Sequence, residues 1–491
     1  MLKSKSVQIV IITTLLAVVS VPGYADMDGR GASSESGEAM TAQLVADLPT
    51  IDAKNVIIMI SDGMGFYHLD ATELYQRGPG ATSQYDDFPV RLAVTTFASG
   101  GEYNPEEAFE DPARVDEGYT DSAAAGTALA TGVKTYRGAI GLDDNKSNLR
   151  NIVELAEENG RRTGVVTSVQ ISHATPATFV AHNESRNNYE EIAKEMLLES
   201  PVDVVMGAGH PEYDNTGRLV EGEREYQYVG GLDTWLEIMR GKAGADADGD
   251  GDPDPWTLIQ DRRQFEELQF GQTPRRVLGV PRVATTLQQS RDVDPDSDED
   301  ESAAAFEIPF NENVPTLEMM TRGALNVLDN GSDGLFLMVE GGAVDWASHA
   351  NQSGRMIEEQ IDFNHAVRAV IDWVEQNSSW DETLLIVTSD HECGHLSGPN
   401  GDKEWNAPQF RGLGVLPEME WQSDAHTNMP VPLFARGVGA EMFKDRVKGT
   451  DPLWGDFVDN VDIAEIMFAS FGATSTAADA PEEDPAVALA Q

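Results

Sequence analysis

The sequence predicts an α/β fold in which helices cover both faces of a mostly parallel central sheet. Strand-like apolar runs alternate along the chain with segments of helical periodicity, which is typical of a parallel sheet with helical crossovers. Four of the apolar runs also end on a side chain that is able to bind a metal ion. Because ligands bind beyond the carboxyl ends of parallel strands, this repeated position indicates an enzyme site at one edge of the sheet.

The expected strands are short apolar runs, and the expected helices are longer segments with apolar residues on one face. We predict strands near residues 55–60, 91–98, 163–169, 202–206, 335–339, 383–389 and 430–435. We predict helices over residues 148–159, 188–199, 315–329 and 354–376. The apolar face of the last helix consists of Ile357, Ile361, Val367, Ile371 and Val374.

The N-terminal residues 1–25 have the pattern of a secretory signal peptide. Lys3 and Lys5 precede an apolar stretch, and the small residues around Tyr24 predict cleavage after Ala25. The apolar stretch is shorter than the roughly 20 residues that span a bilayer. We therefore expect an exported protein, periplasmic or secreted, without a stable membrane anchor.

The mature chain is expected to contain one catalytic domain, residues 49–472. Residues 26–48 and 473–491 lack periodicity and are predicted to be flexible ends. Two regions interrupt the alternation of strands and helices: about 210–312, which carries acidic tracts, and 394–424, which is rich in Gly, Pro and Trp. We expect both regions to be insertions over the active edge of the sheet.

The composition excludes several classes of partner. Lys and Arg number 34 against 84 Asp and Glu, which gives a formal net charge of −50. Such a surface repels nucleic acids and anionic lipids, so we expect no nucleic-acid binding surface. An anionic substrate would still bind where metal ions reverse the field locally. Because Cys393 is the single cysteine, no intramolecular disulfide forms and the fold depends on packing and metals.

An Asp-rich segment resembles the opening of a calcium-binding loop. Asp246, Asp248 and Asp250 have the required spacing, but Thr257 stands at the twelfth position, where the bidentate Glu belongs. A structural calcium ion at this segment is an open alternative. An acidic calcium-binding surface protein is accordingly an alternative function, although it does not explain the metal-competent residues at four strand ends.

The predicted strand ends supply the candidate metal ligands. Asp62, His173 and Glu340 each follow a different apolar run, and Asp390-His391 follows a fourth. We expect these side chains to converge because the carboxyl ends of parallel strands meet at one edge. Downstream of Glu340, Asp345 and His349 stand four residues apart and would share a helical face. Mixed nitrogen and oxygen ligands suit zinc.

Ser122 is the candidate nucleophile. The segment Asp121-Ser122-Ala123-Ala124-Ala125-Gly126 has good helix propensity and would place the hydroxyl at a helix N-terminus, where anions are stabilised. A nearby divalent cation would activate the serine oxygen without a histidine base. The alternative is that Asp121 or Ser122 is only an N-cap.

The sequence His391-Glu392-Cys393-Gly394-His395 spells the HExxH signature of zinc peptidases. In those enzymes the two histidines lie on a helix. Here the motif ends a strand-like run and contains a glycine, so a continuous helix is not expected. A metallopeptidase is therefore retained only as an alternative function, and Cys393 is expected to be a small buried or half-buried thiol.

Together, the motifs resemble those of the alkaline phosphatase family, particularly its halophilic or marine bacterial members. They occur in the family's order and span most of residues 55–436. The motifs are Asp62-Gly63-Met64-Gly65, Asp121-Ser122-Ala123 with Gly126, Glu340 with Asp345 and His349, Asp390-His391, and His426. The resemblance implies hydrolysis of small phosphate monoesters at alkaline pH by a homodimer, through a phosphoserine at Ser122. It also implies that Arg186 binds the phosphoryl group.

The resemblance further implies two zinc ions and one magnesium ion. The first zinc would be held by Asp345, His349 and His426. The second would be held by Asp62, Asp390 and His391, and would contact Ser122. Magnesium would be held by Asp62, Glu340 and Thr175, because oxygen ligands favour that ion.

Two positions depart from the family's bacterial type member. His173 stands where that member has an Asp near magnesium, so we expect weaker magnesium binding or a softer ion at this site. Trp346 stands where it has a phosphate-contacting Lys, so we expect weaker product inhibition. The CxPxR context of sulfatases is absent, and Ser122 replaces the Thr that phosphodiesterases often use.

Overall fold

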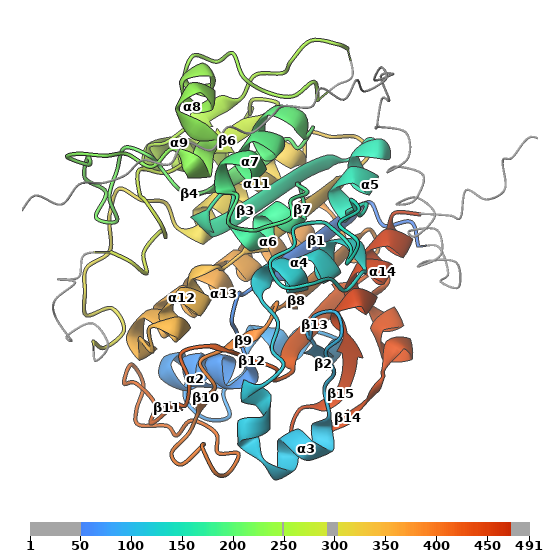
Figure 1. The fold of residues 1–491 in the computed structure, drawn as a ribbon, viewed down its shortest axis with the longest axis vertical. Coiled ribbons are helices and arrows are strands. Elements are labelled where there is room, and N and C mark those ends of the chain that lie inside the picture. Colours follow the sequence, from blue (N-terminus) through green and yellow to red (C-terminus); the bar gives the residue numbers. More distant parts are fainter. Residues whose placement is uncertain (1–50, 248–249, 292–302, 473–491) are drawn as a thin grey trace, which may run out of the picture.

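The computed structural model describes residues 51–247, 250–291 and 303–472. Within these residues the centre is an eleven-stranded sheet with helices on both faces (Figure 1). From one edge to the other, its strands are β14 (Gly449–Asp451), β15 (Gly455–Asp459), β2 (Val90–Thr95), β13 (Val431–Gly437), β8 (Thr383–Thr388), β1 (Asn55–Ile60), β7 (Leu335–Glu340), β3 (Arg162–Gln170), β4 (Val204–Ala208), β6 (Val277–Gly279) and β5 (Thr257–Ile259). The predicted α/β class is therefore confirmed.

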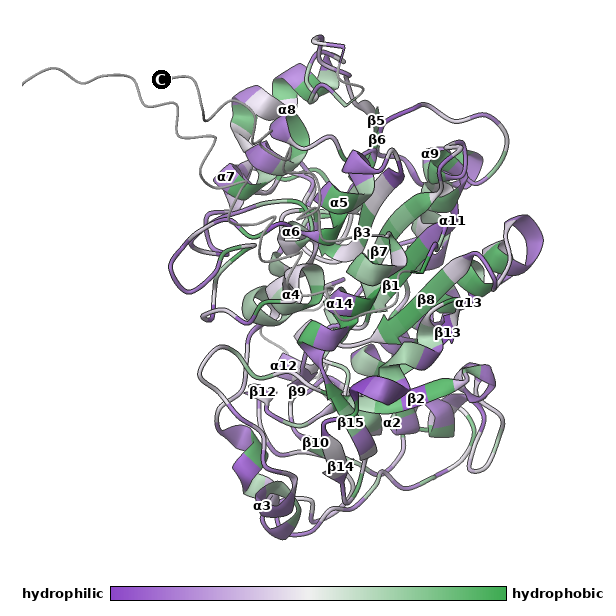
Figure 2. Ribbon diagram, turned by 90° about the vertical axis from the view of Figure 1, so that its right-hand side faces the viewer, coloured by the Kyte–Doolittle hydropathy of each residue, from purple (hydrophilic) through white to green (hydrophobic). Residues whose placement is uncertain are grey.

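The sheet is mostly parallel, as the alternation of strands and helices predicts. Every neighbouring pair from β8 to β5 is parallel. Only β13, which is antiparallel to β8 and β2, and β14, which is antiparallel to β15, reverse direction in the described sheet. Central parallel strands are covered on both faces, which explains why they are continuous apolar runs. All six residues of β1 are buried, and Figure 2 shows the central strands as a hydrophobic layer.

Alternate side chains of the central strands enter two separate cores. In β1, Val56, Ile58 and Ile60 face one core, whereas Ile57 and Met59 face the other. The first core is covered by α4 (Ser122–Thr131), α5 (Ile152–Glu158), α6 (Ala174–Thr178), α7 (Tyr189–Lys194), α8 (Gly231–Met239) and α14 (Asn460–Ser470). The second is covered by α2 (Phe66–Gln76), α9 (Arg262–Leu268), α11 (Leu317–Leu328), α12 (Ala343–His349) and α13 (Ser353–Asn377).

Each predicted helix contains a helix of the structure, but the boundaries are shorter where a capping residue intervenes. The segment predicted over 148–159 begins as α5 only at Ile152, because the Asn151 side chain accepts a hydrogen bond from Glu154 N and caps the helix. The segment predicted over 188–199 is α7 followed by a π-helical turn, Glu195–Glu199.

The two expected insertions differ in structure. Residues 210–312 contribute α8, α9 and the edge strands β5 and β6, which extend the central sheet. Residues 394–424 contain β10 (Leu396–Ser397) and β11 (Glu420–Trp421), which pair with each other. This second region is flanked by β9 (Glu392–Cys393) and β12 (His426–Thr427), which form another antiparallel pair.

The helices that the structure describes include none that combines the length and apolar character needed to cross a membrane. The predicted signal peptide, the expected flexible ends 26–48 and 473–491, and the whole acidic tract 292–301 lie outside the described residues. Export and cleavage after Ala25 therefore stay predictions.

Candidate metal centre

The four strand ends that the sequence singles out belong to four adjacent strands, β8, β1, β7 and β3. The four strands are in register at this end of the sheet, because Ile60 pairs with both Glu340 and Thr388, and Glu340 pairs with Thr167. The residues that follow these pairs consequently leave the sheet at one edge. The three polar clusters described below lie at this edge.

The described residues contain three groups of side chains whose ligand atoms lie within 4.8 Å of one another. The groups are Asp345, His349, Cys393 and His426; Asp62, Asp390 and His391; and Asp62, His173 and Glu340. Asp62 belongs to two of the groups, so one carboxylate has an oxygen for each of two cations. The structure thus brings together every metal ligand predicted from the strand ends, together with the helical pair and His426.

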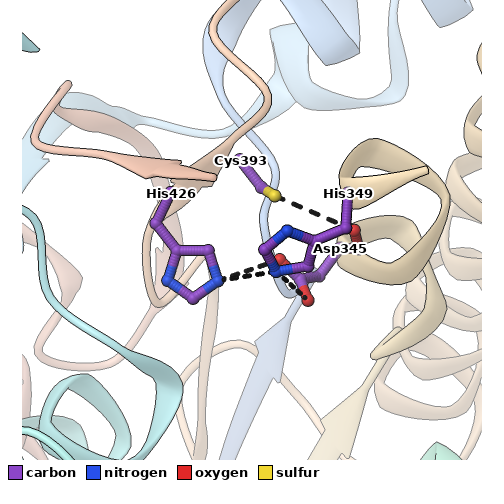
Figure 3. A group of neighbouring side chains, drawn as sticks. All are labelled: Asp345, His349, Cys393 and His426. Atoms are coloured by element: carbon purple, nitrogen blue, oxygen red, sulfur yellow. Dashed lines mark hydrogen bonds and ion pairs between the residues drawn. The ribbon is translucent and has the colours of Figure 1, made fainter. Parts of the chain in front are cut away.

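The first group, shown in Figure 3, presents imidazole lone pairs to one point. The Nδ1 atom of His349 lies 2.6 Å from the Asp424 carbonyl oxygen, and that of His426 lies 3.0 Å from the Thr120 carbonyl oxygen. Each Nδ1–H donates to its carbonyl, which leaves both Nε2 atoms as acceptors only 3.0 Å apart. Two lone pairs at that distance repel each other, so the arrangement fits a cation between them.

Asp345 completes this group from α12, as the four-residue spacing predicts. Its two oxygens lie 3.4 Å from His349 Nε2 and 3.4 Å from His426 Nε2. Burial alone would raise the pKa of Asp345, but the neighbouring imidazoles, that of His426 first, outweigh it and hold the pKa below its usual range. The carboxylate is consequently ionised and able to bind a metal.

The second group contains buried carboxylates whose oxygens lack partners. Asp62, Asp390 and His391 are completely buried, and neither oxygen of Asp62 has a hydrogen-bond partner. Burial and the charge of Asp390 raise the pKa of Asp62 well above its usual range. Burial lowers the pKa of His391, which keeps its imidazole neutral. An unpaired buried carboxylate is costly, so this group also fits a bound cation, which would offset the charge.

The third group is mostly oxygen. Glu340 accepts a hydrogen bond from Thr167 through one oxygen, whereas its other oxygen has no partner. The buried Thr175 hydroxyl also has no hydrogen-bond partner, yet it lies close enough to lower the pKa of Glu340. Burial outweighs both threonines and raises that pKa to about 7. Burial and the charge of Arg186 lower the pKa of His173 to about 3, so its imidazole is neutral.

Ser122 is the first residue of α4, as the sequence predicts. Asp121 is the N-cap, and its side chain accepts a hydrogen bond from Ala124 N at 3.1 Å. The Ser122 hydroxyl lies 3.2 Å from His391 Nε2, within the second group. The capping role and the location beside the metal ligands therefore belong to neighbouring residues, and the two interpretations of this motif do not compete.

Arg186 lies against the same cluster. Its guanidinium donates to Asp121 at 3.2 Å and to His173 Nε2 at 3.4 Å. Asp121 precedes Ser122 in the chain and His173 belongs to the third group, so these two contacts hold the planar guanidinium next to the candidate nucleophile and that group.

A cavity of about 360 Å³ opens onto these residues. It is lined by Ser122, His173, Arg186, Asp345, Trp346, His349 and His426. The volume is suited to a small ligand. A larger cavity of about 510 Å³, beside Phe306 and Phe310, is lined by none of the predicted site residues. We assign the chemistry to the smaller cavity because the ligand atoms converge there.

The HExxH motif does not form a helix. Glu392 and Cys393 are β9, and Gly394 and His395 have left-handed backbone angles, φ +90° and +45°. His395 Nδ1 lies 2.9 Å from Asp116 Oδ1, and His395 belongs to none of the three groups of candidate ligands. The metallopeptidase alternative is therefore unsupported, because its two histidines do not share a helical face.

The expected calcium segment lies apart from this centre and is only partly described. Asp248 is outside the described residues. Asp246 accepts a hydrogen bond from Gly251 N at 2.9 Å, and Asp250 accepts one from Asp252 N at 2.9 Å. These local bonds are those of a turn, and calcium binding stays a prediction.

The sequence did not reveal the groups that orient the candidate ligands without belonging to a ligand group themselves. The Asp424 and Thr120 carbonyls that orient the histidines left no sequence signal, because any residue provides a carbonyl oxygen. His68 was also missed: its Nδ1 accepts from Gly65 N at 3.1 Å, and its Nε2 lies 3.2 Å from the Ser348 hydroxyl. It links the turn after Asp62 to the helix that carries His349.

Comparisons with known proteins agree with this geometry. The family model described as alkaline phosphatase matches residues 53–412. Alkaline phosphatase H of Pseudomonas aeruginosa is 30% identical over 414 residues, which cover 75% of this chain and 77% of that protein. Alkaline phosphatase 4 of Bacillus subtilis is 28% identical over 406 residues, covering 82% of this chain and 75% of that protein.

Solved structures share the fold. A cold-active alkaline phosphatase from Shewanella sp. superposes with a TM-score of 0.60 at 26% identity, covering 85% of this chain and 99% of the other. The alkaline phosphatase of the Antarctic bacterium TAB5 has a TM-score of 0.58 at 24% identity, covering 86% and 99%. The matched family model spans most of the chain and includes most of the clustered ligands. The chain therefore belongs to the alkaline phosphatase family.

Proposed function

We propose that this enzyme hydrolyses phosphate monoesters through a phosphoserine at Ser122 and releases inorganic phosphate at alkaline pH. Family membership supports phosphate monoesters as substrates. The observation that carries the proposal is Asp62: both of its buried oxygens lack partners, and it belongs to two ligand groups beside the Ser122 hydroxyl. A carboxylate in that position is stabilised by cations on either side.

The donor sets support a choice of cation for each group. Asp345, His349 and His426 offer nitrogen and oxygen, as do Asp62, Asp390 and His391, and each set suits zinc. Asp62, Glu340 and Thr175 offer oxygen, which suits magnesium. His173 belongs to the same third group and would weaken its preference for magnesium. A variant of TAB5 alkaline phosphatase in which aspartate replaces a histidine has Mg bound in its M3 site.

The chain's own residues position and neutralise the phosphoryl group. When bound, the cations would lower the pKa of the serine hydroxyl and stabilise charge on the leaving oxygen. Ser122 Oγ loses its proton to solvent and forms a bond to phosphorus, while the ester P–O bond breaks and the departing alkoxide takes up a proton to become the alcohol. Water oxygen then forms a bond to phosphorus as the water loses a proton, the bond between phosphorus and Ser122 Oγ breaks, and Ser122 Oγ regains a proton as phosphate is released. Arg186 binds two phosphoryl oxygens through its planar fork, and the N-terminus of α4 favours their negative charge.

The nucleophile is tested by Ser122→Ala. We expect turnover of an aryl phosphate to fall by roughly a thousandfold or more, because no covalent intermediate forms. Acid quenching with radiolabelled substrate should trap phosphoenzyme in the wild type and none in the variant. Ser332→Ala, an exposed serine in a distant turn, is the matched control and should retain both signals. A Ser122→Ala enzyme with full turnover excludes the covalent mechanism.

Metal dependence is tested by chelation. We expect hydrolysis to stop when metals are removed and to return with zinc and magnesium, with metal analysis giving two zinc ions and one magnesium ion per chain. Magnesium that is fully retained at trace supply contradicts the weakened third site. Cleavage of casein without phosphatase activity would favour the peptidase alternative instead.

Assembly and location complete the proposal. We expect a homodimer, on the basis of the family resemblance, and an exported chain that begins at Asp26. Light scattering measures the first, and the intact mass of the protein recovered outside the cytoplasm measures the second. A monomeric active enzyme or an uncleaved N-terminus would contradict the corresponding expectation.

A further inference from the structure

Cys393 is the member of the first ligand group that the proposed function does not use. It is completely buried, and its sulfur lies within 4.8 Å of ligand atoms of Asp345, His349 and His426. Figure 3 shows the thiol beside these side chains, with Sγ 3.8 Å from the Asp345 carbonyl oxygen. The sulfur is therefore close enough to these ligand atoms to bind the same ion.

Strand pairing explains why the thiol is there. Cys393 in β9 is directly opposite His426 in β12, in an antiparallel pair. Residues directly opposite each other project to the same face of the pair, with their Cβ atoms about 5 Å apart. The backbone fixes this juxtaposition independently of any rotamer, because Cys393 N also donates to Gly63 O at 3.0 Å. Pairing of β9 with β12 thus places the Cys393 side chain on the same face as His426.

A second observation shows that the group is short of a partner. Asp345 Oδ1 is buried without a hydrogen-bond partner, and the Nε2 atoms of His349 and His426 present lone pairs to each other at 3.0 Å. A zinc ion with bonds of about 2.0 to 2.3 Å would bind one oxygen, two nitrogens and one sulfur, and a fifth coordination position would stay available to a substrate oxygen. These donor types are those that zinc prefers in proteins.

We propose that Cys393 is a fourth protein ligand of the first metal site, bound as a thiolate together with Asp345, His349 and His426. On binding, the S–H bond breaks, its proton passes to solvent and a sulfur–metal bond forms. The inference rests on the first metal site of the proposed function. A thiolate at this position selects zinc, cobalt or cadmium over magnesium, because those ions accept soft ligands.

Cobalt substitution tests the assignment without relying on activity. The metal-free full-length enzyme is reloaded with Co²⁺ and Mg²⁺, and its near-ultraviolet spectrum is searched for a thiolate-to-cobalt charge-transfer band. Because the chain has one cysteine, a band in the wild type identifies Cys393 as the source. We expect the band in the wild type and its loss in Cys393→Ser, with zinc affinity reduced about ten- to hundredfold in competition with a chromophoric chelator.

His349→Ala is the matched variant that retains the cysteine but removes a partner ligand. Its band should be lost or strongly weakened, because the sulfur no longer shares a complete site. Cobalt-loaded wild type that hydrolyses phosphate esters without the band overturns the cysteine inference and leaves the proposed function standing. Failure of the wild type to bind cobalt or zinc at all would overturn both. The wild-type spectrum decides the question even if a variant fails to fold.

Discussion

Asp62 is the residue on which the candidate centre depends, because its two oxygens connect separate ligand groups. It follows β1, the strand between β8 and β7, and so stands between the strands that carry Asp390 and Glu340. Its burial costs free energy unless cations lie on both sides. Bound cations would account for a completely buried carboxylate that has no hydrogen-bond partner.

Trp346 supports a prediction at the same scale. It lines the cavity with Arg186, and its ring centroid lies 5.8 Å from that of His173. Trp346→Lys adds a cation to this cavity and should tighten inhibition by inorganic phosphate about tenfold. Turnover should fall if phosphate release limits it. Inhibition constants measured for wild type, Trp346→Lys and the uncharged control Trp346→Met test this, and equal values in all three contradict it.

At the scale of the element, the level ends of adjacent parallel strands create the site, and a tight turn fixes how they meet. Gly63 follows Asp62 with φ +78°, and an added Cβ would lie 2.8 Å from Asp345 Cα. The turn also donates from Gly63 N to Asp390 at 3.3 Å. The close approach of this turn to α12 therefore holds ligands of two groups together.

Gly63→Ala should consequently lower both stability and metal content. We expect a loss of about 2 to 3 kcal/mol from steric conflict and the strained φ, measured by urea unfolding, together with weaker zinc retention. Gly100→Ala is the matched control, because Gly100 has φ +76° but open space around it. The control isolates the cost of the backbone angle. Equal losses in both variants would show that the contact with Asp345 is unimportant.

A second element-scale prediction concerns the segment between α6 and the π-helical turn. His182 Nδ1 lies 3.0 Å from Glu195 Oε1, and its Nε2 lies 2.8 Å from the Leu149 carbonyl oxygen. Burial alone would lower the pKa of His182, but the hydrogen bond to Glu195 and the nearby acidic charges outweigh it and raise the pKa to about 9. The protonated imidazole therefore links this segment, which leads to Arg186, to Glu195 and to the Leu149 carbonyl.

The sign of the pH dependence follows from that raised pKa. The stability that the protonated His182 contributes is fully present below the unfolded pKa of about 6.5 and is lost as pH rises through about 9. The glutamine in His182→Gln cannot be protonated. The free energy of unfolding of this variant should therefore be lower than that of wild type by on the order of 3 kcal/mol at pH 6, and the difference should shrink toward pH 10. Urea unfolding across this range tests the prediction. A constant deficit would mean that His182 is neutral throughout.

At the scale of the whole molecule, charge is the dominant feature. A net charge of −50 produces self-repulsion in the compact state, and salt screens it. We expect the urea midpoint to rise as NaCl increases from about 0.05 to 1 M, over which the Debye length falls to about 3 Å. Zinc and magnesium are held constant, and sucrose at matched osmolality is the control. A midpoint that is unchanged by salt contradicts the argument.

Much of the fold follows from local patterns. Apolar runs predicted the ends of β1, β3, β7 and β8 to within one residue, because strands buried on both faces must be apolar throughout. The polar residue at each strand end indicated the edge where ligands meet, and Ser122 at the start of α4 followed from helix propensity and capping. The edge strands β5 and β6 were not predicted, because each is only three residues long.

The sequence by itself determined the fold class, the family and the candidate ligands, because periodicity and motifs are local properties of the chain. Only the tertiary structure decided that β9 pairs with β12, which places the Cys393 thiol opposite His426. It also decided that Asp121 holds Arg186 and that backbone carbonyls orient two imidazoles. Which atoms share a space depends on strand register and on the path of connecting loops, and neither is encoded in residue spacing.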